Sequence, residues 1–195
     1  MEYPQIFALI AFAFASTVSP GPNNIMLMTS GANVGFMRTI PHMLGIVVGF
    51  SLMVILVGIG LMGIFTAYPI AHQALQIGCI IYLVYLAIKI ALSRPASNDA
   101  QTYKPMSFWT AASFQWINPK AWSMALTAVS VYNLSANWHG VLLISLVFAA
   151  VNIPSVTIWT VAGKQLQVLL NSPSKIRAFN CGMAGLLLAS TLPMV

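Results

Sequence analysis

Residues 41–65 read PHMLGIVVGFSLMVILVGIGLMGIF, which is 25 consecutive residues without a formally charged side chain. A helix of about 20 apolar residues crosses the ~30 Å hydrocarbon layer of a bilayer, so this stretch predicts a transmembrane helix. The whole chain has the same character, because 59% of its 195 residues are hydrophobic and 5% are charged. Soluble domains carry about 25% charged residues. The sequence therefore predicts an all-α membrane protein whose surface lies mostly in the lipid bilayer.

Five further apolar segments surround this stretch. They cover roughly residues 6–36, 70–92, 106–132, 140–162 and 178–194. The polar linker 93–105 divides the chain into residues 1–92 and 106–195, with three segments in each part. Because three is an odd number, the two parts enter the membrane from opposite sides. We therefore expect one transmembrane domain over residues 1–195, with six helices in two inverted three-helix repeats.

The cations predict the orientation of these helices. Seven of the eight Lys and Arg residues fall at one set of helix ends and connections, namely Arg38, Lys89, Arg94, Lys104, Lys164, Lys175 and Arg177. The positive-inside rule places them in the cytoplasm, and an even number of helices then puts both termini outside. The net charge of +6 is explained by this arrangement, so we expect no nucleic-acid partner.

The apolar segment 6–36 is interrupted at its centre by the hexapeptide SPGPNN, residues 19–24. A straight helix of this length would span ~46 Å, which is more than the bilayer needs. Pro20 and Pro22 remove two backbone donors, and Gly21 tolerates backbone conformations that other residues avoid. We expect the helix to unwind here, near the middle of the membrane.

The segment 106–132 contains a second interruption, Asn118-Pro119-Lys120. Asn118 is a good N-cap and Pro119 a good first helical residue, so a half-helix should begin at this point. An alternative is that residues 106–117 lie on the membrane surface. Lys120 would then sit at the cytoplasmic interface rather than at mid-membrane.

Two Pro-interrupted helices in matching positions of inverted halves predict the substrate site of a transporter. Free N–H groups at a half-helix start attract a carboxylate, and free carbonyl groups attract an ammonium group. Such a site suits a zwitterion. The candidate substrate-binding residues are Pro20, Gly21, Pro22, Asn23, Asn24, Asn118, Pro119 and Lys120.

These motifs resemble the LysE/RhtB family of amino-acid exporters. The resemblance is carried by residues 20–24, by Gly35-Phe36, by the run YLVYLAIK at residues 82–89, and by residues 118–120. Within the family, the chain looks most like the cysteine/O-acetylserine exporter branch. The resemblance implies a multi-pass protein of the bacterial inner membrane that exports an amino acid or a relative of one.

Several polar residues leave more than one role open. Asn23 and Asn24 could bind substrate or cap the unwound turn. Lys120, if it lies at mid-membrane, should pair with a substrate carboxylate, backbone carbonyl groups or water. Lys89, near a helix end, is expected to be an anchor that reaches the membrane surface.

The two carboxylates, Glu2 and Asp99, both lie outside the predicted helices. Proton coupling would therefore need His42, His72, Lys120, water or the substrate itself, because no buried acid can carry a proton. His42 and His72 lie near predicted helix ends, so we expect both to be interfacial. The absence of a buried acid also disfavours a cationic substrate.

Other functions have less support. The sequence holds no carboxylate pair, Ser/His/Asp triad, Walker loop or metal-ligand spacing, so we expect no enzyme, cofactor or metal. An ion channel or metal-ion permease would need rings of charge or acid ligands. A structural subunit that transports nothing would leave both helix breaks unexplained. Gly45 and Gly49 permit close helix packing, which would allow a homodimer.

Overall fold

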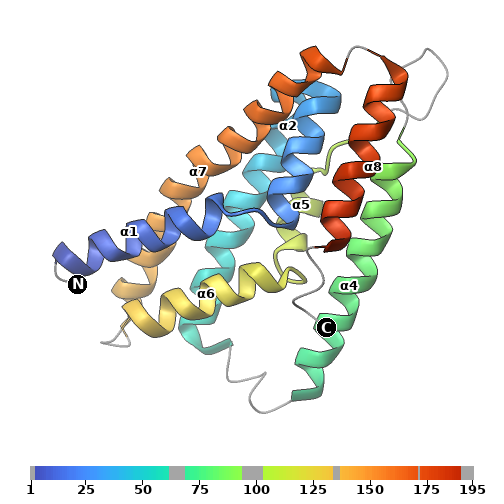
Figure 1. The fold of residues 1–195 in the computed structure, drawn as a ribbon. Helices are drawn as coiled ribbons and strands as arrows, with labels where there is room; N and C mark the ends of the chain where they lie inside the picture. The colour runs from blue at the N-terminus through green and yellow to red at the C-terminus, as the bar shows by residue number, and fades with distance from the viewer. Residues whose placement is uncertain (1–2, 62–68, 94–102, 134–136, 171, 190–195) are drawn as a thin grey trace.

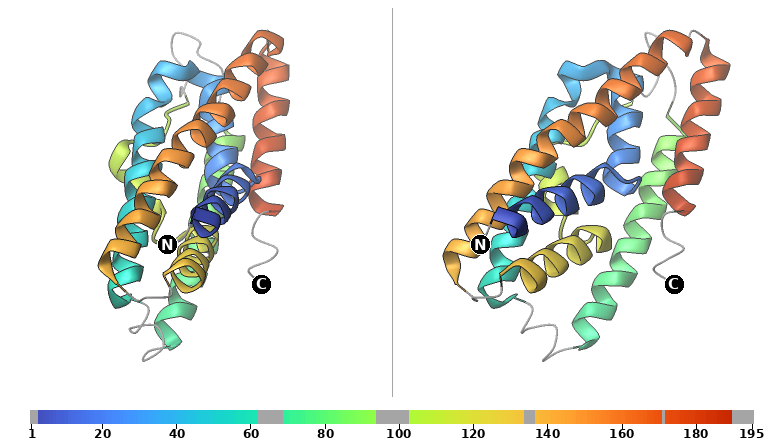
Figure 2. Two further views of the ribbon diagram at one scale, coloured as in Figure 1. Left: turned by 90° about the vertical axis from the view of Figure 1, so that its left-hand side faces the viewer. Right: turned by 60° about the vertical axis from the view of Figure 1, so that its left-hand side comes forward.

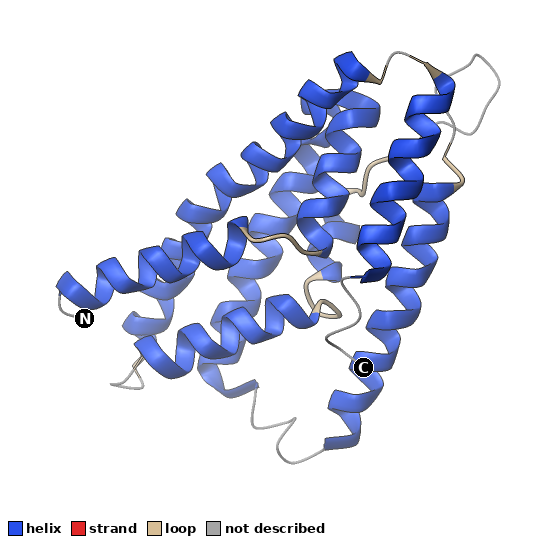
Figure 3. Ribbon diagram, viewed as in Figure 1, coloured by secondary structure: helices blue, strands red, loops and turns tan. Residues whose placement is uncertain are grey.

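The computed structural model describes residues 3–61, 69–93, 103–133, 137–170 and 172–189, and in these ranges it contains helices and loops but no strands (Figure 3). The element order is α1 (Tyr3–Val18), α2 (Pro22–Leu56), the π-helix η1 (Val57–Leu61), α4 (Pro69–Ala91), α5 (Phe108–Phe114), α6 (Pro119–Tyr132), α7 (Trp138–Leu169) and α8 (Pro173–Ala189) (Figure 1). The all-α prediction is confirmed for these residues.

The described helices include membrane-spanning candidates. Pro22–Gly60, which is divided at Gly35, and Trp138–Leu166 are long and apolar enough to cross a bilayer, and Tyr3–Val18 and Ile80–Ala91 are shorter apolar helices. α1 has 16 residues and α6 has 14. At 1.5 Å per residue, each is about 21–24 Å long, which is less than the ~30 Å hydrocarbon layer.

Helix α2 consists of two arms that meet at Gly35. This residue has φ 79° and ψ 178°, a backbone conformation that glycine adopts far more readily than other residues. The chain reverses there, and the arm before Gly35 runs beside the arm after it (Figures 1 and 2). The connection between the first two apolar segments was predicted at residues 36–41, slightly too far along the chain. Gly35 makes the turn, and Pro41 lies inside the second arm.

Glycines allow the arms of α2 to pack closely on their neighbours. A Cβ atom at Gly31 would clash with the Thr160 carbonyl group of α7, and one at Gly163 would clash with the Met28 carbonyl group of the first arm. In the second arm, a Cβ at Gly49 would lie 2.6 Å from Ala112 Cα of α5. Gly45 meets the same helix at the Phe108 carbonyl group.

The Gly45 and Gly49 face is thus covered by α5 of the same chain. The predicted close packing is confirmed, but it is intramolecular, so this face gives no support to a homodimer. The packing also bears on the alternative that residues 106–117 lie on a membrane surface. Ala111 and Phe114 are buried, while Trp109 on the same helix is 77% exposed. α5 therefore has one face inside the helix bundle.

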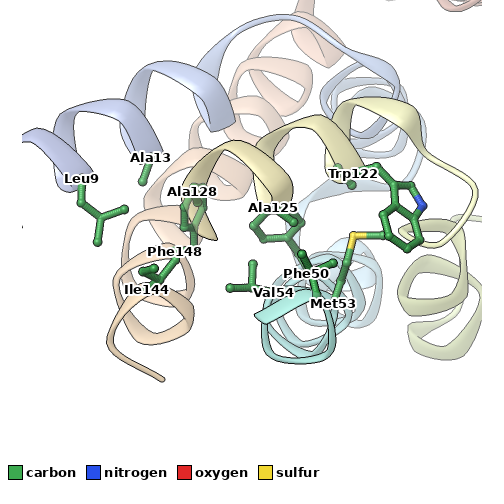
Figure 4. Packing of buried hydrophobic residues seen from close by; sticks show 12 residues of the cluster. Leu9, Ala13, Phe50, Met53, Val54, Trp122, Ala125, Ala128, Ile144 and Phe148 are labelled. Atoms are coloured by element: carbon green, nitrogen blue, oxygen red, sulfur yellow. The ribbon is translucent and has the colours of Figure 1, made fainter. Parts of the chain in front are cut away.

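Among the described residues, one core cluster joins α1, α2, η1, α6 and α7 (Figure 4). Leu9 and Ala13 of α1, Phe50 and Met53 of α2, Ala125 and Ala128 of α6, and Ile144 and Phe148 of α7 are all buried in it. The Phe50 and Phe148 rings lie 5.1 Å apart between centroids. This core holds α1 beside α6, which brings the two helix breaks together.

Two predicted helix starts were late. The helix expected from residue 140 begins at Trp138, where Asn137 Oδ1 accepts from Gly140 N at 2.7 Å. The helix expected from residue 178 begins at Pro173, where Ser172 Oγ accepts from Lys175 N at 3.4 Å. In both cases a polar residue satisfies the free N–H groups of the first turn, so the helix extends beyond its apolar stretch. The predicted ends at residues 65 and 194 lie outside the described residues.

Candidate functional site

Both predicted helix breaks are present. α1 ends at Val18 and α2 begins at Pro22, while α5 ends at Phe114 and α6 begins at Pro119. α1 and α6 run antiparallel, so the C-terminal end of α1 lies beside the N-terminal end of α6 (Figures 1 and 2). Each break is followed by a proline in the first turn of the next helix, where its missing N–H group costs no hydrogen bond.

Lys120 connects the two breaks. Its Nζ donates to Ser19 O at 2.6 Å, to Ser19 Oγ at 2.9 Å and to Pro20 O at 3.4 Å. The ammonium group in the first turn of α6 is thus held by carbonyl oxygens that follow α1. Lys120 is partly buried, whereas the six other described Lys and Arg residues are exposed, namely Arg38, Lys89, Lys104, Lys164, Lys175 and Arg177.

The remaining carbonyl groups at the end of α1 are also satisfied by side chains. Asn24 Nδ2 donates to Thr17 O at 2.7 Å and to Ser19 O at 2.8 Å. Trp159 Nε1 from α7 donates to Val18 O at 3.0 Å. A helix end otherwise leaves its last carbonyl groups without partners. Of the two roles open to Asn24, capping is therefore the one that the structure shows.

The second break has its own caps. Asn118 is buried and accepts from Lys120 N at 3.1 Å, so its predicted N-cap role is confirmed. Trp122 Nε1 donates to Trp116 O at 2.7 Å, which fixes the loop that leads into α6. These contacts hold the N-terminal end of α6, with its partial positive charge, against the first break.

An amide pair crosses between the breaks. Asn23 Nδ2 donates to Gln115 Oε1 at 2.9 Å, and Gln115 Nε2 lies 3.3 Å from Asn23 Oδ1. Gln115 is fully buried and also donates to Ala111 O at 2.9 Å. Asn23 is only partly buried, so its amide can reach a ligand by giving up one of these bonds.

These residues surround a small polar cavity of about 20 Å³, which is room for about one water molecule. An amino acid is larger than this volume. The lining residues are Ser16, Thr17, Gly21, Asn23, Asn24, Ile46, Phe50, Gln115, Asn118, Lys120, Met124 and Asn152.

Five of the eight predicted site residues line this cavity, namely Gly21, Asn23, Asn24, Asn118 and Lys120. Pro20, Pro22 and Pro119 do not line it. Pro22 and Pro119 begin helices, and Pro20 contributes its carbonyl oxygen to Lys120.

The expected reason for Gly21 was wrong. Its backbone is extended, with φ −176° and ψ 176°, which any residue can adopt. The constraint is space, because a Cβ atom would lie 2.8 Å from Lys120 Cδ and 3.1 Å from Lys120 Nζ. Glycine at this position allows the lysine to reach the carbonyl groups after α1.

Gln115 and Asn152 were not among the predicted residues, yet both line the cavity beside them. A signal for both was available, since each is a polar residue inside an apolar segment. Polar side chains within transmembrane segments face the protein interior and mark functional sites. Asn152, which is 6% exposed, lies on α7, a helix that contains neither break.

The expectation that His42 is interfacial was also wrong. Its side chain is fully buried between the arms of α2 and the segment that precedes α5, because the turn at Gly35 folds the first arm over it. His72 was expected to be interfacial too, but its side chain lies outside the described residues. Within the described ranges, no three His, Cys, Asp or Glu side chains gather to hold a metal ion.

Apolar helices interrupted around a shared polar cavity define the class of the protein, a membrane transporter. The chain belongs to the LysE type translocator family, whose sequence profile matches residues 14–191. This confirms the family resemblance of the motifs at the two breaks.

The chain is similar to curated relatives named cysteine/O-acetylserine efflux protein. Those from Escherichia coli strain K12, Shigella sonnei and Shigella flexneri serotype 5b are each 29% identical over 166 residues, which cover 83% of this chain and 84% of the relative. No solved structure matches the chain.

Proposed function

We propose that the protein exports a small neutral amino acid or amino-acid derivative, with cysteine and O-acetylserine as the first candidates. The observation that carries this proposal is the contact of Lys120 Nζ with the Ser19 and Pro20 carbonyl oxygens beside a polar cavity. The name of the curated relatives supplies the candidate substrates.

A zwitterion can replace this contact on both sides. Its carboxylate would take Lys120 as partner, and its ammonium group would take the carbonyl oxygens that Lys120 releases. Charge-assisted hydrogen bonds are about twice as strong as neutral ones. The strong bonds that Lys120 gives up are therefore replaced by equally strong bonds to the substrate. The N-terminal ends of α2 and α6 add partial positive charge near the carboxylate.

The charge of the site also selects the substrate. The described helices contain no carboxylate, because Glu2 and Asp99 are the two acids of the chain and both lie outside them. A substrate with a second positive charge, such as lysine or arginine, would approach Lys120 without a compensating anion. Like charges that approach in a partly buried site repel strongly. A neutral amino acid avoids this cost.

The proposed architecture has six transmembrane helices in two inverted repeats, residues 1–92 and 106–195, with linker 93–105. The similar local design of the breaks, a short non-helical stretch followed by Pro22 or Pro119, supports the repeats. We place the protein in the bacterial inner membrane with both termini outside. The cation-bearing ends of α7, α8 and the Gly35 turn gather at one end of the molecule (Figure 1), as that orientation requires.

Transport by purified protein in liposomes tests the proposed substrate class. Radiolabelled cysteine, kept reduced, and O-acetylserine should both be carried, whereas lysine and arginine should be carried at least about tenfold more slowly because of the Lys120 charge. Protein-free liposomes supply the background. Transport of lysine at the same rate as cysteine would contradict the proposed site, and conduction of inorganic ions would favour a channel.

Cysteine labelling tests the orientation. In a variant with Cys79→Ser and Cys181→Ser, single cysteines at positions 98 and 137 should behave oppositely. A membrane-impermeant maleimide added to whole cells should label Asn137→Cys and spare Asn98→Cys, since the cation-bearing ends should face the cytoplasm. Labelling of position 98 from outside with protection of position 137 would reverse the assignment.

A further inference from the structure

A buried hydrogen-bonded chain lies apart from the candidate substrate site. His42 in the second arm of α2 and Ser30 in the first arm are both fully buried. His42 Nδ1 lies 3.3 Å from Ser30 Oγ, and Ser30 Oγ lies 2.9 Å from Tyr103 OH. His42 Nε2 is also buried and has no hydrogen-bond partner among the described residues. A buried polar atom without a partner is costly, so it calls for an explanation.

One end of this chain reaches a large cavity. Tyr103 helps to line a cavity of about 900 Å³ at the C-terminal end of α4, with Lys89 and Lys104 also in its lining. Burial raises the pKa of Tyr103 to about 12. Its hydroxyl group therefore stays neutral at physiological pH and can both accept and donate a proton. It connects the open cavity with the buried imidazole through a single serine hydroxyl.

The other end lies next to the substrate site. Ile46 follows His42 by one helical turn and lines the small cavity between the helix breaks. Residues four apart on a helix face the same side, with about 5–6 Å between Cβ atoms. His42 is thus between the two cavities, about one turn of helix from the substrate site.

Among the described residues, His42 is the group best placed to take up a proton. The helices hold no carboxylate, and His139 on α7 is exposed. The first arm of α2 and α5 contain no charged residue. The charged residues on the elements around His42 are exposed cations, namely Arg38 one turn before it, Lys164 on α7, Lys175 and Arg177 on α8, and Lys89 and Lys104 at the cavity.

We propose that His42 is the proton-binding residue that couples substrate export to proton entry, with Ser30 and Tyr103 as its connection to the larger cavity. This rests on the proposed exporter function. One proton binds at Nε2 and one leaves from Nδ1, while the Ser30 and Tyr103 hydroxyl groups each accept a proton and donate another. Water in the larger cavity receives the last proton, so the count of protons is unchanged.

The surroundings of His42 also explain why proton binding would be tightly coupled to a rearrangement of α2. A buried imidazolium with no carboxylate nearby is costly. The proton-loaded form must therefore differ from the described conformation, with water beside the ring. The conformation described here, with the substrate cavity nearly closed, is the proton-free form. Proton binding and the rearrangement of α2 are then one event.

Transport in liposomes separates proton coupling from substrate binding. With O-acetylserine as probe, His42→Gln should keep exchange of internal for external substrate, since the substrate site is intact. Its accumulation driven by a pH gradient, and the accompanying proton flux seen with an internal dye, should fall about 100-fold, the lower end of what a positioned proton-transfer group contributes. His139→Gln, at an exposed histidine, is the matched control and should behave as the wild type. Tyr103→Phe should slow the pH-driven mode alone.

Nitrogen-15 NMR of the histidines gives a second test, and its pH titration needs neither substrate nor a measurement of transport. The chain has three histidines, so His72→Gln and His139→Gln assign the His42 signals in the otherwise intact protein. His42 should take up a proton between about pH 5 and 8, the range in which histidine acts as a switch. Adding O-acetylserine should shift it toward the neutral form.

The outcomes separate the two proposals. If the wild type exchanges neither O-acetylserine nor cysteine, the proposed function fails, and the NMR titration still tests His42. If the wild type exchanges substrate and His42→Gln retains full pH-driven accumulation, the coupling role is overturned. An imidazole that stays neutral down to pH 5 overturns it as well.

Discussion

Replacing Lys120 with methionine should reduce transport of cysteine or O-acetylserine about 100-fold, equivalent to about 2.7 kcal/mol, at matched membrane abundance. Methionine keeps much of the length of the side chain but cannot pair with a carboxylate. The loss of a partner from a buried charged contact costs about 2–5 kcal/mol, which sets the expected size. The protein should still insert, because Asn24 and Trp159 continue to cap the end of α1.

The arginine variant separates a binding role for Lys120 from an anchoring one. Lys120 Nζ reaches past Gly21 to two carbonyl oxygens, and a guanidinium group is larger, planar and differently hydrated. Lys120→Arg should therefore restore little transport. Lys164→Met, at an exposed lysine, is the control and should leave transport near normal. Near-normal transport by Lys120→Arg would make Lys120 an interfacial anchor and remove it from the site.

Gly21→Val should also abolish measurable transport, with a loss of at least about 100-fold. Even the first added carbon would lie 2.8 Å from Lys120 Cδ and 3.1 Å from Nζ, and valine adds two methyl groups beyond it. The lysine would have to leave its carbonyl partners, and the cavity beside it would be filled. The atoms that would clash belong to the flexible end of the lysine side chain, which can move away, so the protein should remain folded but inactive.

The control for this substitution is Gly182→Val on α8. A Cβ atom at Gly182 meets nothing within 4 Å, so the same change of residue is made without a steric conflict. Transport by this variant should stay within about twofold of the wild type, since surface substitutions usually change stability by less than about 0.5 kcal/mol. Normal transport by Gly21→Val would show that the contact between Gly21 and Lys120 is not needed, and the proposed site would fail.

Joint replacement of Pro20 and Pro22 by alanine tests the same break through its backbone and should likewise impair transport.

The helix breaks could be predicted because their causes are local. A proline without an N–H group interrupts a helix wherever it falls, and Asn118-Pro119 is a start signal that needs no distant partner. The starts at Trp138 and Pro173 also have local causes, but they were placed too late because only the apolar stretches were used. Polar caps extend both helices beyond those stretches. The turn at Gly35 was placed nearly correctly from the limits of the apolar segments.

The contacts at the site could not be predicted in this way. Lys120 and Ser19 are 101 positions apart in the chain, and Asn23 and Gln115 are 92 apart. Sequence showed that Asn23 and Asn24 were both candidates for capping or binding, but neighbouring residues have equal claims until the helices are packed. The structure separates them, because Asn24 faces the end of α1 and Asn23 faces Gln115.

The sequence by itself determined that this is a membrane protein, that it is helical, and where two of its helices break. Each of these follows from composition or from the backbone chemistry of a few adjacent residues. Only the tertiary structure decided that Gly21 makes room for Lys120, that α5 covers Gly45 and Gly49, and that His42 is buried rather than interfacial. Burial and close contact depend on which helices lie side by side, and that is set by packing among segments far apart in the chain.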